Sequence, residues 1–434
     1  LSHFLTEYSA WISLALLVLM FASFIAERLA PSATAVGGAA AFMALGYVGE
    51  EEALGAFSNS APISIAAMFI LAAEIMTSGQ TSNRLLSLVE SFVGHLRGGL
   101  AVTSAVACTL FGAISGSTQA TVVAIGKPLR PRMIESGYPD KFATALIINA
   151  SDIALLIPPS IGMIVYGVGS GTSIGELFIA GIGPGLLILI LFCAYSVLAT
   201  YKFKVDPAPK SSWADRGKAL KDAAMPLGFP AIIIGGIYAG FFSPTEAAAV
   251  SVLYAIILEC FFFRSLGLKD LPRIALSTGL VTAVVFILVG AGAAFSWVIS
   301  FAELPTQIIN ETLGLSADSG YWTVALTIAA AFFIGCMFVD PIVVILILTP
   351  IFHPLALAVG MDPVLTGVLV TLQVAIGSAT PPFGCDIFTA IAVFQKSYRE
   401  VIAGTPPFVF ILLAVSFLLI AFPQIALFLR DLAF

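Results

Sequence analysis

Long uninterrupted apolar runs constrain this chain more than any other feature. Each approaches or exceeds the roughly 20 apolar residues that a helix needs to cross the hydrocarbon core of a bilayer. Only 10% of the residues are charged and the mean hydropathy is +1.05, whereas soluble domains average about 25% charged residues. The runs therefore exclude a soluble globular protein and predict an all-α polytopic membrane protein. They lie at roughly 9–26, 33–48, 61–78, 141–168, 177–200, 226–242, 246–263, 276–300, 363–395 and 403–429.

Other protein classes find no support in the sequence. No basic stripe carries interleaved aromatic residues, so we expect no nucleic-acid partner. The five cysteines stand singly in apolar runs without a CxxC pair, and we interpret them as small core residues. The N-terminus lacks the basic region of a cleavable signal peptide, so residues 11–26 are expected to form the first span.

The uncharged stretch 98–126 predicts a re-entrant hairpin. Arg97 and Lys127 flank it, and positive residues favour the cytoplasmic side. Its 29 residues would make a straight helix of about 44 Å, which is too long for one span of about 30 Å and too short for two. A hairpin with its tip near Ile114-Ser115-Gly116-Ser117 satisfies both constraints.

The basic residues then define an orientation. With the N-terminus outside, 18 of the 19 lysines and arginines fall in cytoplasmic segments and only Arg430 falls outside. Glu50, Glu51 and Glu52 fall outside with Glu303, Glu311 and Asp318. We therefore expect a periplasmic N-terminus. The one long polar segment, 201–225, is expected to be a loop with a short amphipathic helix.

The chain repeats itself weakly at an offset of 223 residues. Pro158-Pro159 corresponds to Pro381-Pro382, Gly112 to Gly335, and the tip residue Ser117 to Asp340. Each half holds five full crossings and a hairpin, the second at 321–357 with its tip near Asp340. Because five is odd, the halves enter the membrane from opposite sides, which is the inverted repeat of secondary transporters. The predicted fold has about ten full spans and two re-entrant hairpins.

Two consecutive prolines interrupt a span in each half. They remove amide donors and break the helix, so freed carbonyls at membrane depth need a partner. Broken helices in transporters use such carbonyls to bind Na⁺ and use helix N-termini to hold anions. We therefore predict two equivalent pockets, each pairing one hairpin tip with one break. The alternative is a proline kink that neighbouring helices satisfy.

Four acidic residues are expected within the membrane, where they are functional candidates by default. Asp340 lies at a tip, Asp386 just past a break, and Asp152 just before one. Glu74 is expected away from both pockets, in a structural or a functional role. No lysine or arginine is expected deep in the membrane.

Four stretches resemble the large membrane subunit of tripartite ATP-independent periplasmic (TRAP) transporters. They are residues 111–167, Phe242-Ser243-Pro244-Thr245-Glu246-Ala247-Ala248-Ala249, Phe338-Val339-Asp340-Pro341, and Gly377-Ser378-Ala379-Thr380-Pro381-Pro382-Phe383-Gly384. The resemblance covers essentially the whole chain and is closest to the sialic acid branch.

The resemblance implies an elevator-type transporter of the ion-transporter superfamily in the bacterial inner membrane. It also implies that the chain is not an enzyme. The chain would import an organic acid, with sialic acid (N-acetylneuraminate) as the expected substrate and a C4-dicarboxylate as an alternative. Two or more Na⁺ ions would drive uptake without a nucleotide, and no Walker A pattern is present. The implied partners are a separate four-helix membrane subunit of Q type and a periplasmic substrate-binding protein.

The resemblance also assigns regions and sites. Scaffold helices would occupy 1–97, 169–225 (with a cytoplasmic linker), 226–320 and 396–434, and the transport domain 98–168 and 321–395. Substrate would lie near Ser115, Ser117, Ser160 and Asp340. Na⁺ ligands would come from Ser115, Ala154, Ile157 and Pro159 at one site, and from Gly335, Asp340, Gly377 and Thr380 at the other.

Two other classes remain as alternatives. An intramembrane protease would need a nucleophile such as Ser115 with a base, but the histidines are His3, His95 and His353, and no GxGD motif occurs. A channel could also be built from broken helices. Accumulation that depends on a Na⁺ gradient would distinguish the carrier from the channel.

Overall fold

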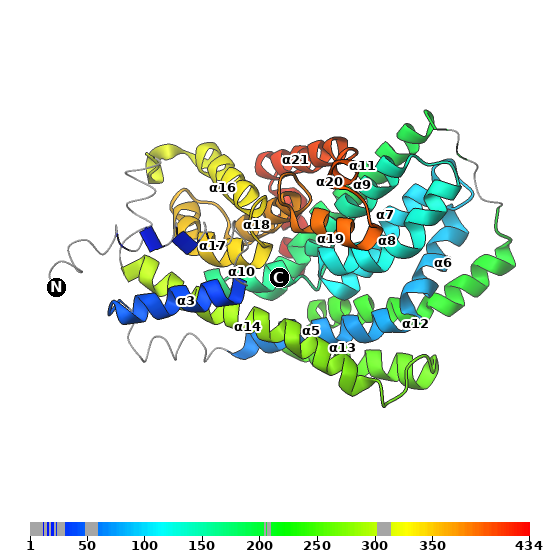
Figure 1. Cartoon of the computed structure of the whole chain (residues 1–434), viewed down its shortest axis with the longest axis horizontal. Coiled ribbons are helices and arrows are strands. Elements are labelled where there is room, and N and C mark those ends of the chain that lie inside the picture. Colours follow the sequence, from blue (N-terminus) through cyan, green and yellow to red (C-terminus); the bar gives the residue numbers. More distant parts are fainter. Residues whose placement is uncertain are drawn as a thin grey trace.

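The computed structural model is helical throughout the part that it describes, with no strand there (Figure 1). That part comprises residues 31–47, 60–203, 205, 210–301 and 314–434, with positions 12, 15, 16, 19, 20 and 23. Glu50, Glu51, Glu52, Glu303 and Glu311 lie outside the described residues, as does most of the predicted first span. The described helices agree with the all-α prediction.

The first hairpin and the first broken helix lie close to their predicted positions. α7 (Gly99–Ser115) and α8 (Thr118–Glu135) pack against each other, and the turn between them falls at Gly116 and Ser117. At 1.5 Å per residue the 17 residues of α7 span about 26 Å, less than a bilayer core. α9 (Asp140–Ser151) and the 3₁₀ turn η1 (Asp152–Leu155) precede the break, and α10 (Ile161–Ser170) follows it.

The second half repeats this order. α16 (Tyr321–Cys336), α17 (Pro341–Ala358), α18 (Pro363–Ser378) and α19 (Cys385–Phe394) follow in turn. Both bounds of α17 are those of α8 shifted by 223 residues. Ser117 and Asp340 are the N-cap residues of these two helices, and each side chain accepts a hydrogen bond from a backbone amide of the first turn. The structure therefore shows the repeat that the sequence indicated.

The two halves interlock. α8 packs on α19 of the second half, and α17 packs on α10 of the first, which are equivalent pairs under the repeat. α16 packs on α18, as α7 packs on α9. We call α7–α10 with η1, together with α16–α19, the hairpin core. It lies in the upper part of Figure 1.

A second group of helices covers one side of the hairpin core. In Figure 1 most of it lies below the core, and α6 lies beside α7 at the right. We call this group the α5 layer. α5 packs on α13 and α14, and α12 packs on α6 and α13. Its members are α3 (Pro31–Ala44), α5 (Ser60–Ser78), α6 (Thr81–Val93), α12 (Trp213–Tyr238), α13 (Pro244–Ile256), the π-helical η2 (Ile257–Phe262) and α14 (Leu271–Phe301).

A buried glutamate fixes the bend between α5 and α6. Glu259 accepts hydrogen bonds from the Gln80 amide (3.0 Å), the Thr81 amide (3.1 Å) and the Thr81 hydroxyl (2.6 Å). It thereby satisfies amides at the N-terminus of α6 that have no intrahelical partner. A Cβ on Gly79 would lie 2.0 Å from the carboxylate, so a side chain there would displace Glu259 from the bend.

Two predictions about helix continuity are wrong. The segment 201–225 does not end in a separate short helix, because α12 runs without interruption from Trp213 to Tyr238. The run 403–429 is not one straight helix: α21 (Pro406–Ala421) and α22 (Gln424–Ala433) meet at 59° beside Pro423. Proline at this point removes an amide donor and clashes with the preceding turn.

The remaining described elements are α11 (Ile174–Thr200), the 3₁₀ turn η4 (Ala317–Ser319) and α20 (Tyr398–Ile402). Within the described ranges four helices are long and apolar enough to cross a membrane: α11, α12, α13 with η2, and α17. The bent pair α21 and α22 brings this number to five.

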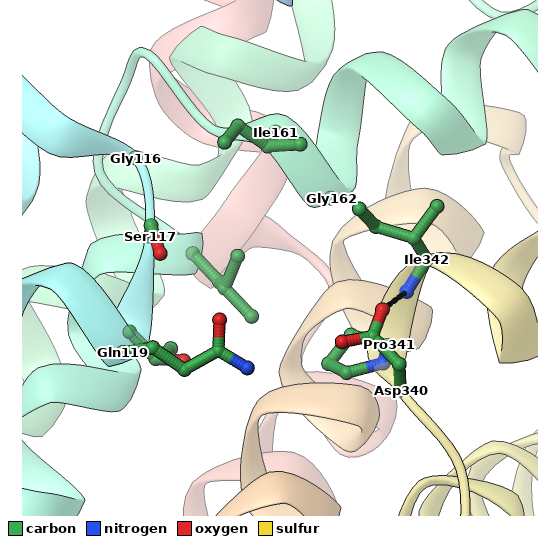
Figure 2. Close-up of a pocket in the computed structure, with 10 residues that line it drawn as sticks. Gly116, Ser117, Gln119, Ile161, Gly162, Asp340, Pro341 and Ile342 are labelled. Atoms are coloured by element: carbon green, nitrogen blue, oxygen red, sulfur yellow. Dashed lines mark hydrogen bonds between the residues drawn. The ribbon is translucent and has the colours of Figure 1, made fainter. Parts of the chain in front are cut away.

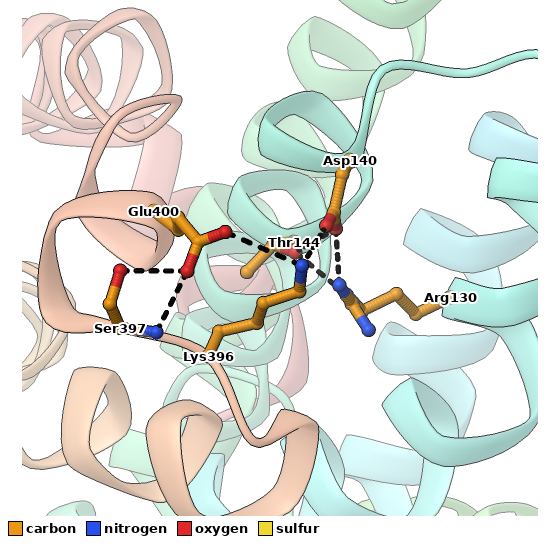
Figure 3. A network of polar contacts seen from close by, with 6 residues as sticks. All are labelled: Arg130, Asp140, Thr144, Lys396, Ser397 and Glu400. Carbon is orange, nitrogen blue, oxygen red and sulfur yellow. Dashed lines mark hydrogen bonds and ion pairs between the residues drawn. The ribbon is translucent and has the colours of Figure 1, made fainter.

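An ion-pair network joins the loop after α19 to the start of α9 (Figure 3). The Lys396 ammonium lies 2.9 Å from Asp140 and 3.4 Å from Glu400, and Asp140 also pairs with Arg130. The hydroxyl and then the amide of Ser397, followed by the charge of Lys396, lower the pKa of Glu400. The network connects the two halves of the hairpin core at their polar end.

Candidate functional site

Each hairpin tip lies against the broken helix of its own half. In the first half the Ile161 amide donates to the Gly116 carbonyl at 3.4 Å. In the second half the Phe383 amide donates to the Met337 carbonyl at 3.1 Å. Both bonds join a tip to the segment just after a Pro-Pro pair. The predicted pairing of one tip with one break is therefore present in both halves.

Glycines allow the backbones to approach at these contacts. A Cβ on Gly112 would lie 2.7 Å from the Ala154 Cα, and one on Gly377 would lie 2.6 Å from the Cys336 Cβ. Gly116 has φ +59°, and its Cβ would lie 2.3 Å from the Pro159 carbonyl oxygen. Such distances exclude any side chain, so glycine brings the carbonyls of tip and break together.

Two of the predicted substrate residues lie at the first tip. Ser115 ends α7, and its hydroxyl lies 3.1 Å from that of Thr121 and donates to the Ser117 carbonyl at 3.3 Å. The Ser117 hydroxyl accepts from the Ala120 amide at 3.4 Å. Both serines line a cavity described below.

Ser160 has a different environment. It is fully buried at the N-cap of α10, where its hydroxyl donates to the Leu155 carbonyl at 2.5 Å and accepts from the Met163 amide at 3.2 Å. It lines neither cavity described here. In this arrangement Ser160 holds the end of the break and does not face a ligand space.

Asp340 lies at the second tip and faces the first (Figure 2). Its carboxylate accepts from the Ile342 amide at 2.9 Å, and the side chain of Gln119 points toward it across a narrow cavity of about 60 Å³. The first turns of α8 and α17 both border this cavity. Two helix N-termini therefore border one space. The start of α8 favours an anionic group there, whereas the start of α17 is already capped by the Asp340 carboxylate.

A larger cavity of about 460 Å³ adjoins the narrow one, and its volume is typical of small-molecule sites. The two cavities share the lining residues Ser117, Gln119, Ile161 and Ile342. Its other wall comes from α5, which contributes Ile70, Ala73, Glu74 and Thr77. The expectation that Glu74 lies away from both pockets is thus wrong, because α5 packs against α7 and α10 beside the first tip.

The residues predicted for the first Na⁺ site surround the contact between Gly112 and η1. Ala154 lies in η1, fully buried, and Ile157 and Pro159 lie in the break. Ser115 lies in the tip next to Gly116, which contacts Pro159. These residues present a hydroxyl and backbone carbonyls, which are the hard oxygen donors that an alkali cation takes from broken helices.

The residues predicted for the second Na⁺ site surround the equivalent contact. The Gly335 carbonyl accepts from the amides of Phe338 and Val339, and the Gly377 carbonyl accepts from that of Thr380. The Thr380 hydroxyl donates to the Ile376 carbonyl at 2.6 Å. Asp340 stands at the N-terminus of α17 beside the same tip. The set again consists of oxygen donors, with one carboxylate.

A buried acidic residue links the first tip to the second break. The Asp386 carboxylate accepts from the hydroxyls of Thr118 and Ser378, each at 2.7 Å. Asp152 is also buried, and neither of its carboxylate oxygens has a hydrogen-bond partner among the described residues. The sequence indicated both acids, but it did not indicate that Thr118 bonds across 268 positions to Asp386.

Comparison with a family model matches residues 4–425 to the DctM component of tripartite ATP-independent periplasmic transporters. The ectoine/5-hydroxyectoine TRAP transporter large permease protein of Ruegeria pomeroyi is 66% identical over 85% of each chain. The ectoine TRAP transporter large permease protein of Halomonas elongata is 62% identical over 91% of this chain and 92% of its own.

The expected placement in the sialic acid branch is not supported. The sialic acid TRAP transporter large permease protein of Vibrio cholerae is only 35% identical over 88% of this chain and 89% of its own. Among solved structures, the YdaH transporter of Alcanivorax borkumensis superposes with a TM-score of 0.60 at 17% identity, covering 86% of this chain and 87% of that one. That likeness shows a shared transporter fold.

Proposed function

Since this chain belongs to the DctM component family of tripartite ATP-independent periplasmic transporters, we propose that it forms the permease path for ectoine or a closely similar small organic acid. The chain is a membrane transporter subunit and not an enzyme. The observation that carries the proposal is the cavity between the first hairpin tip and α5, bordered by two helix N-termini. Such a space suits a small carboxylate-bearing solute.

The relatives and the cavity together support the proposed substrate. The two ectoine permeases share nearly twice the identity of the C4-dicarboxylate permease of Pseudomonas aeruginosa, which is 36% identical. Ectoine is a compact ring with one carboxylate. Neither cavity is lined by lysine or arginine, so helix N-termini, hydroxyls and Gln119 would bind the carboxylate. A C4-dicarboxylate is the alternative substrate.

We further propose that Na⁺ is the coupling ion. The two tip-and-break contacts would each bind one ion, the first through Ser115, Ala154, Ile157 and Pro159. The second would use Gly335, Asp340, Gly377 and Thr380. The close backbone approaches at Gly112 and Gly377 support this assignment, because they gather carbonyls where the helices are broken. Ion binding at each contact would hold its tip closed and shape the substrate cavity.

The two helix groups suit alternating access by an elevator movement. The hairpin core corresponds to the proposed transport domain, 98–168 and 321–395, and the α5 layer to part of the scaffold. In this proposal the hairpin core carries substrate and ions past the α5 layer. The chain would lie in the bacterial inner membrane with a periplasmic N-terminus. Its partners would be a small four-helix membrane subunit and a periplasmic binding protein.

An uptake screen tests the proposal. The permease is reconstituted in liposomes with its small subunit, an inward Na⁺ gradient is imposed, and each labelled solute is supplied with its binding protein. We expect uptake of ectoine in preference to a C4-dicarboxylate such as succinate. Uptake of succinate without uptake of ectoine would contradict the proposed substrate. Replacing Ser115 by alanine or Asp340 by asparagine should impair uptake, and unchanged uptake in both variants would contradict the site.

A further inference from the structure

Glu74 stands alone as a charged side chain on the α5 wall of the larger cavity. It faces the same space as Ser115, Ser117 and Gln119 of the hairpin core. α5 has no other charged residue along its 19 positions. A carboxylate in an apolar helix at this depth is costly unless it has a function or a partner.

The Glu74 carboxylate lacks a partner in the described part of the chain. It forms no hydrogen bond or ion pair with any residue in the described ranges, and its side chain is exposed to the cavity. Asp340, the other acid that lines the two cavities, accepts the Ile342 amide of its own helix. Of these two carboxylates, Glu74 is the one without a hydrogen bond to the described residues.

The cavity has ends of opposite polarity. The N-terminus of α8, with its unpaired amides behind Ser117, favours a negative group at one side. Glu74 favours a positive group or a hydrogen-bond donor on the other. A dicarboxylate matches only the first side and is repelled by the second. A zwitterion matches both.

We propose that Glu74 determines specificity by binding the cationic group of a zwitterionic substrate, whose carboxylate lies at the N-terminus of α8. This inference rests on the proposed function and specifies its substrate class. Ectoine fits it, since its ring carries an amidinium beside the carboxylate. The two amidinium N–H groups diverge on either side of the ring methyl, so one of them can donate a charge-assisted hydrogen bond to the Glu74 carboxylate.

The position of Glu74 gives the contact a second consequence. α5 packs on α13 and α14 of the α5 layer, while Ser115 and Ser117 belong to the hairpin core. Substrate in the cavity therefore touches both groups of helices at once. When the hairpin core moves, the contact with Glu74 breaks while the contacts with the tip persist. Glu74 thus selects the substrate in one access state only.

The test compares Glu74→Gln and Glu74→Asp with a matched control. The control is Glu176→Gln, which neutralises a carboxylate in the first turn of α11 that lines neither cavity. Each variant is purified with its small subunit in Na⁺, and ligand affinity is measured from the rise in melting temperature with ectoine and with succinate. This readout needs no binding protein, so it reports the permease site itself.

A hydrogen bond to a charged group contributes enough for about a 10- to 100-fold loss of ectoine affinity in Glu74→Gln. Succinate affinity should stay equal or rise, so that the preference between the two ligands shifts. Glu74→Asp should retain part of the preference, and Glu176→Gln should match the wild type.

Two results would overturn the inference. One is an unchanged preference in Glu74→Gln, and the other is an equal loss of both ligands with a lowered melting temperature, which indicates a structural role. In either case wild-type uptake of ectoine would leave the proposed function standing. If the wild-type complex binds succinate and not ectoine, the proposed substrate and this inference both fail.

Discussion

Replacing Gly116 by alanine tests whether the close approach of the first tip to the first break matters. Gly116 adopts φ +59°, and an added Cβ would lie 2.3 Å from the Pro159 carbonyl oxygen. Gly171 provides the matched control, because it adopts φ +74° with nothing within 4 Å of an added Cβ. Alanine at Gly171 therefore meets only the backbone penalty, whereas alanine at Gly116 also displaces the break.

The magnitudes follow from these two terms. A left-handed backbone costs about 1–2 kcal/mol for a residue with a Cβ, and both variants incur it. Overpacking adds about 1–3 kcal/mol, and only Gly116→Ala incurs it. If the tip must be in place for the first Na⁺ to bind, the overpacking energy of Gly116→Ala acts as a coupling energy between the tip and the Na⁺ site. It corresponds to about a 5- to 150-fold weaker Na⁺ affinity than in Gly171→Ala.

The assay is Na⁺-dependent thermal stabilisation of the purified permease with its small subunit, titrated against K⁺ at constant ionic strength. We expect Gly171→Ala to melt slightly below the wild type with an unchanged Na⁺ midpoint. Gly116→Ala should melt lower and shift the midpoint to higher Na⁺. Equal Na⁺ midpoints in the two alanine variants would refute the argument that the tip-and-break contact shapes the ion site.

Three further predictions concern contacts elsewhere in the chain. Thr118→Val keeps the shape of the side chain but removes one hydrogen-bond donor from the buried Asp386 carboxylate. The free energy of unfolding should therefore fall by about 1–3 kcal/mol in a denaturation series. A melting temperature equal to that of the wild type would contradict this role. Glu259→Ala should release the N-terminus of α6 and speed hydrogen exchange of the amides of Gln80 and Thr81, and unchanged exchange there would count against the cap. The depressed pKa of Glu400 stabilises α20 above the unfolded pKa of about 4.3, and this contribution is lost as pH falls through the folded value. Ser397→Ala should move this loss of α20 stability to higher pH. The assay is labelling of a cysteine introduced at position 401, and a labelling profile that does not shift to higher pH would contradict the prediction.

The local parts of the site could be predicted from the sequence. Pro158-Pro159 and Pro381-Pro382 break their helices because proline lacks an amide donor, and Gly116 permits a turn that other residues resist. These are properties of a residue and its immediate neighbours. The offset of 223 residues further predicts a tip and a break in the same order and spacing in both halves.

Contacts between distant segments could not be predicted in this way. Glu74 lines the cavity only because α5 packs against α7 and α10, and the sequence states no such packing. The bond from Thr118 to Asp386 depends on the interlocking of the two halves. The bend at Pro423 did have a local indication, but the apolar run through it concealed the change of direction.

The proposed activity of this permease is the coupling of a Na⁺ gradient to the movement of a small organic acid. The most direct measurement is accumulation of labelled ectoine in liposomes containing the permease and its small subunit, with the binding protein outside. We expect uphill accumulation under an inward Na⁺ gradient that ceases when an ionophore collapses the gradient. Equilibration of ectoine at the same rate with and without the Na⁺ gradient would contradict it.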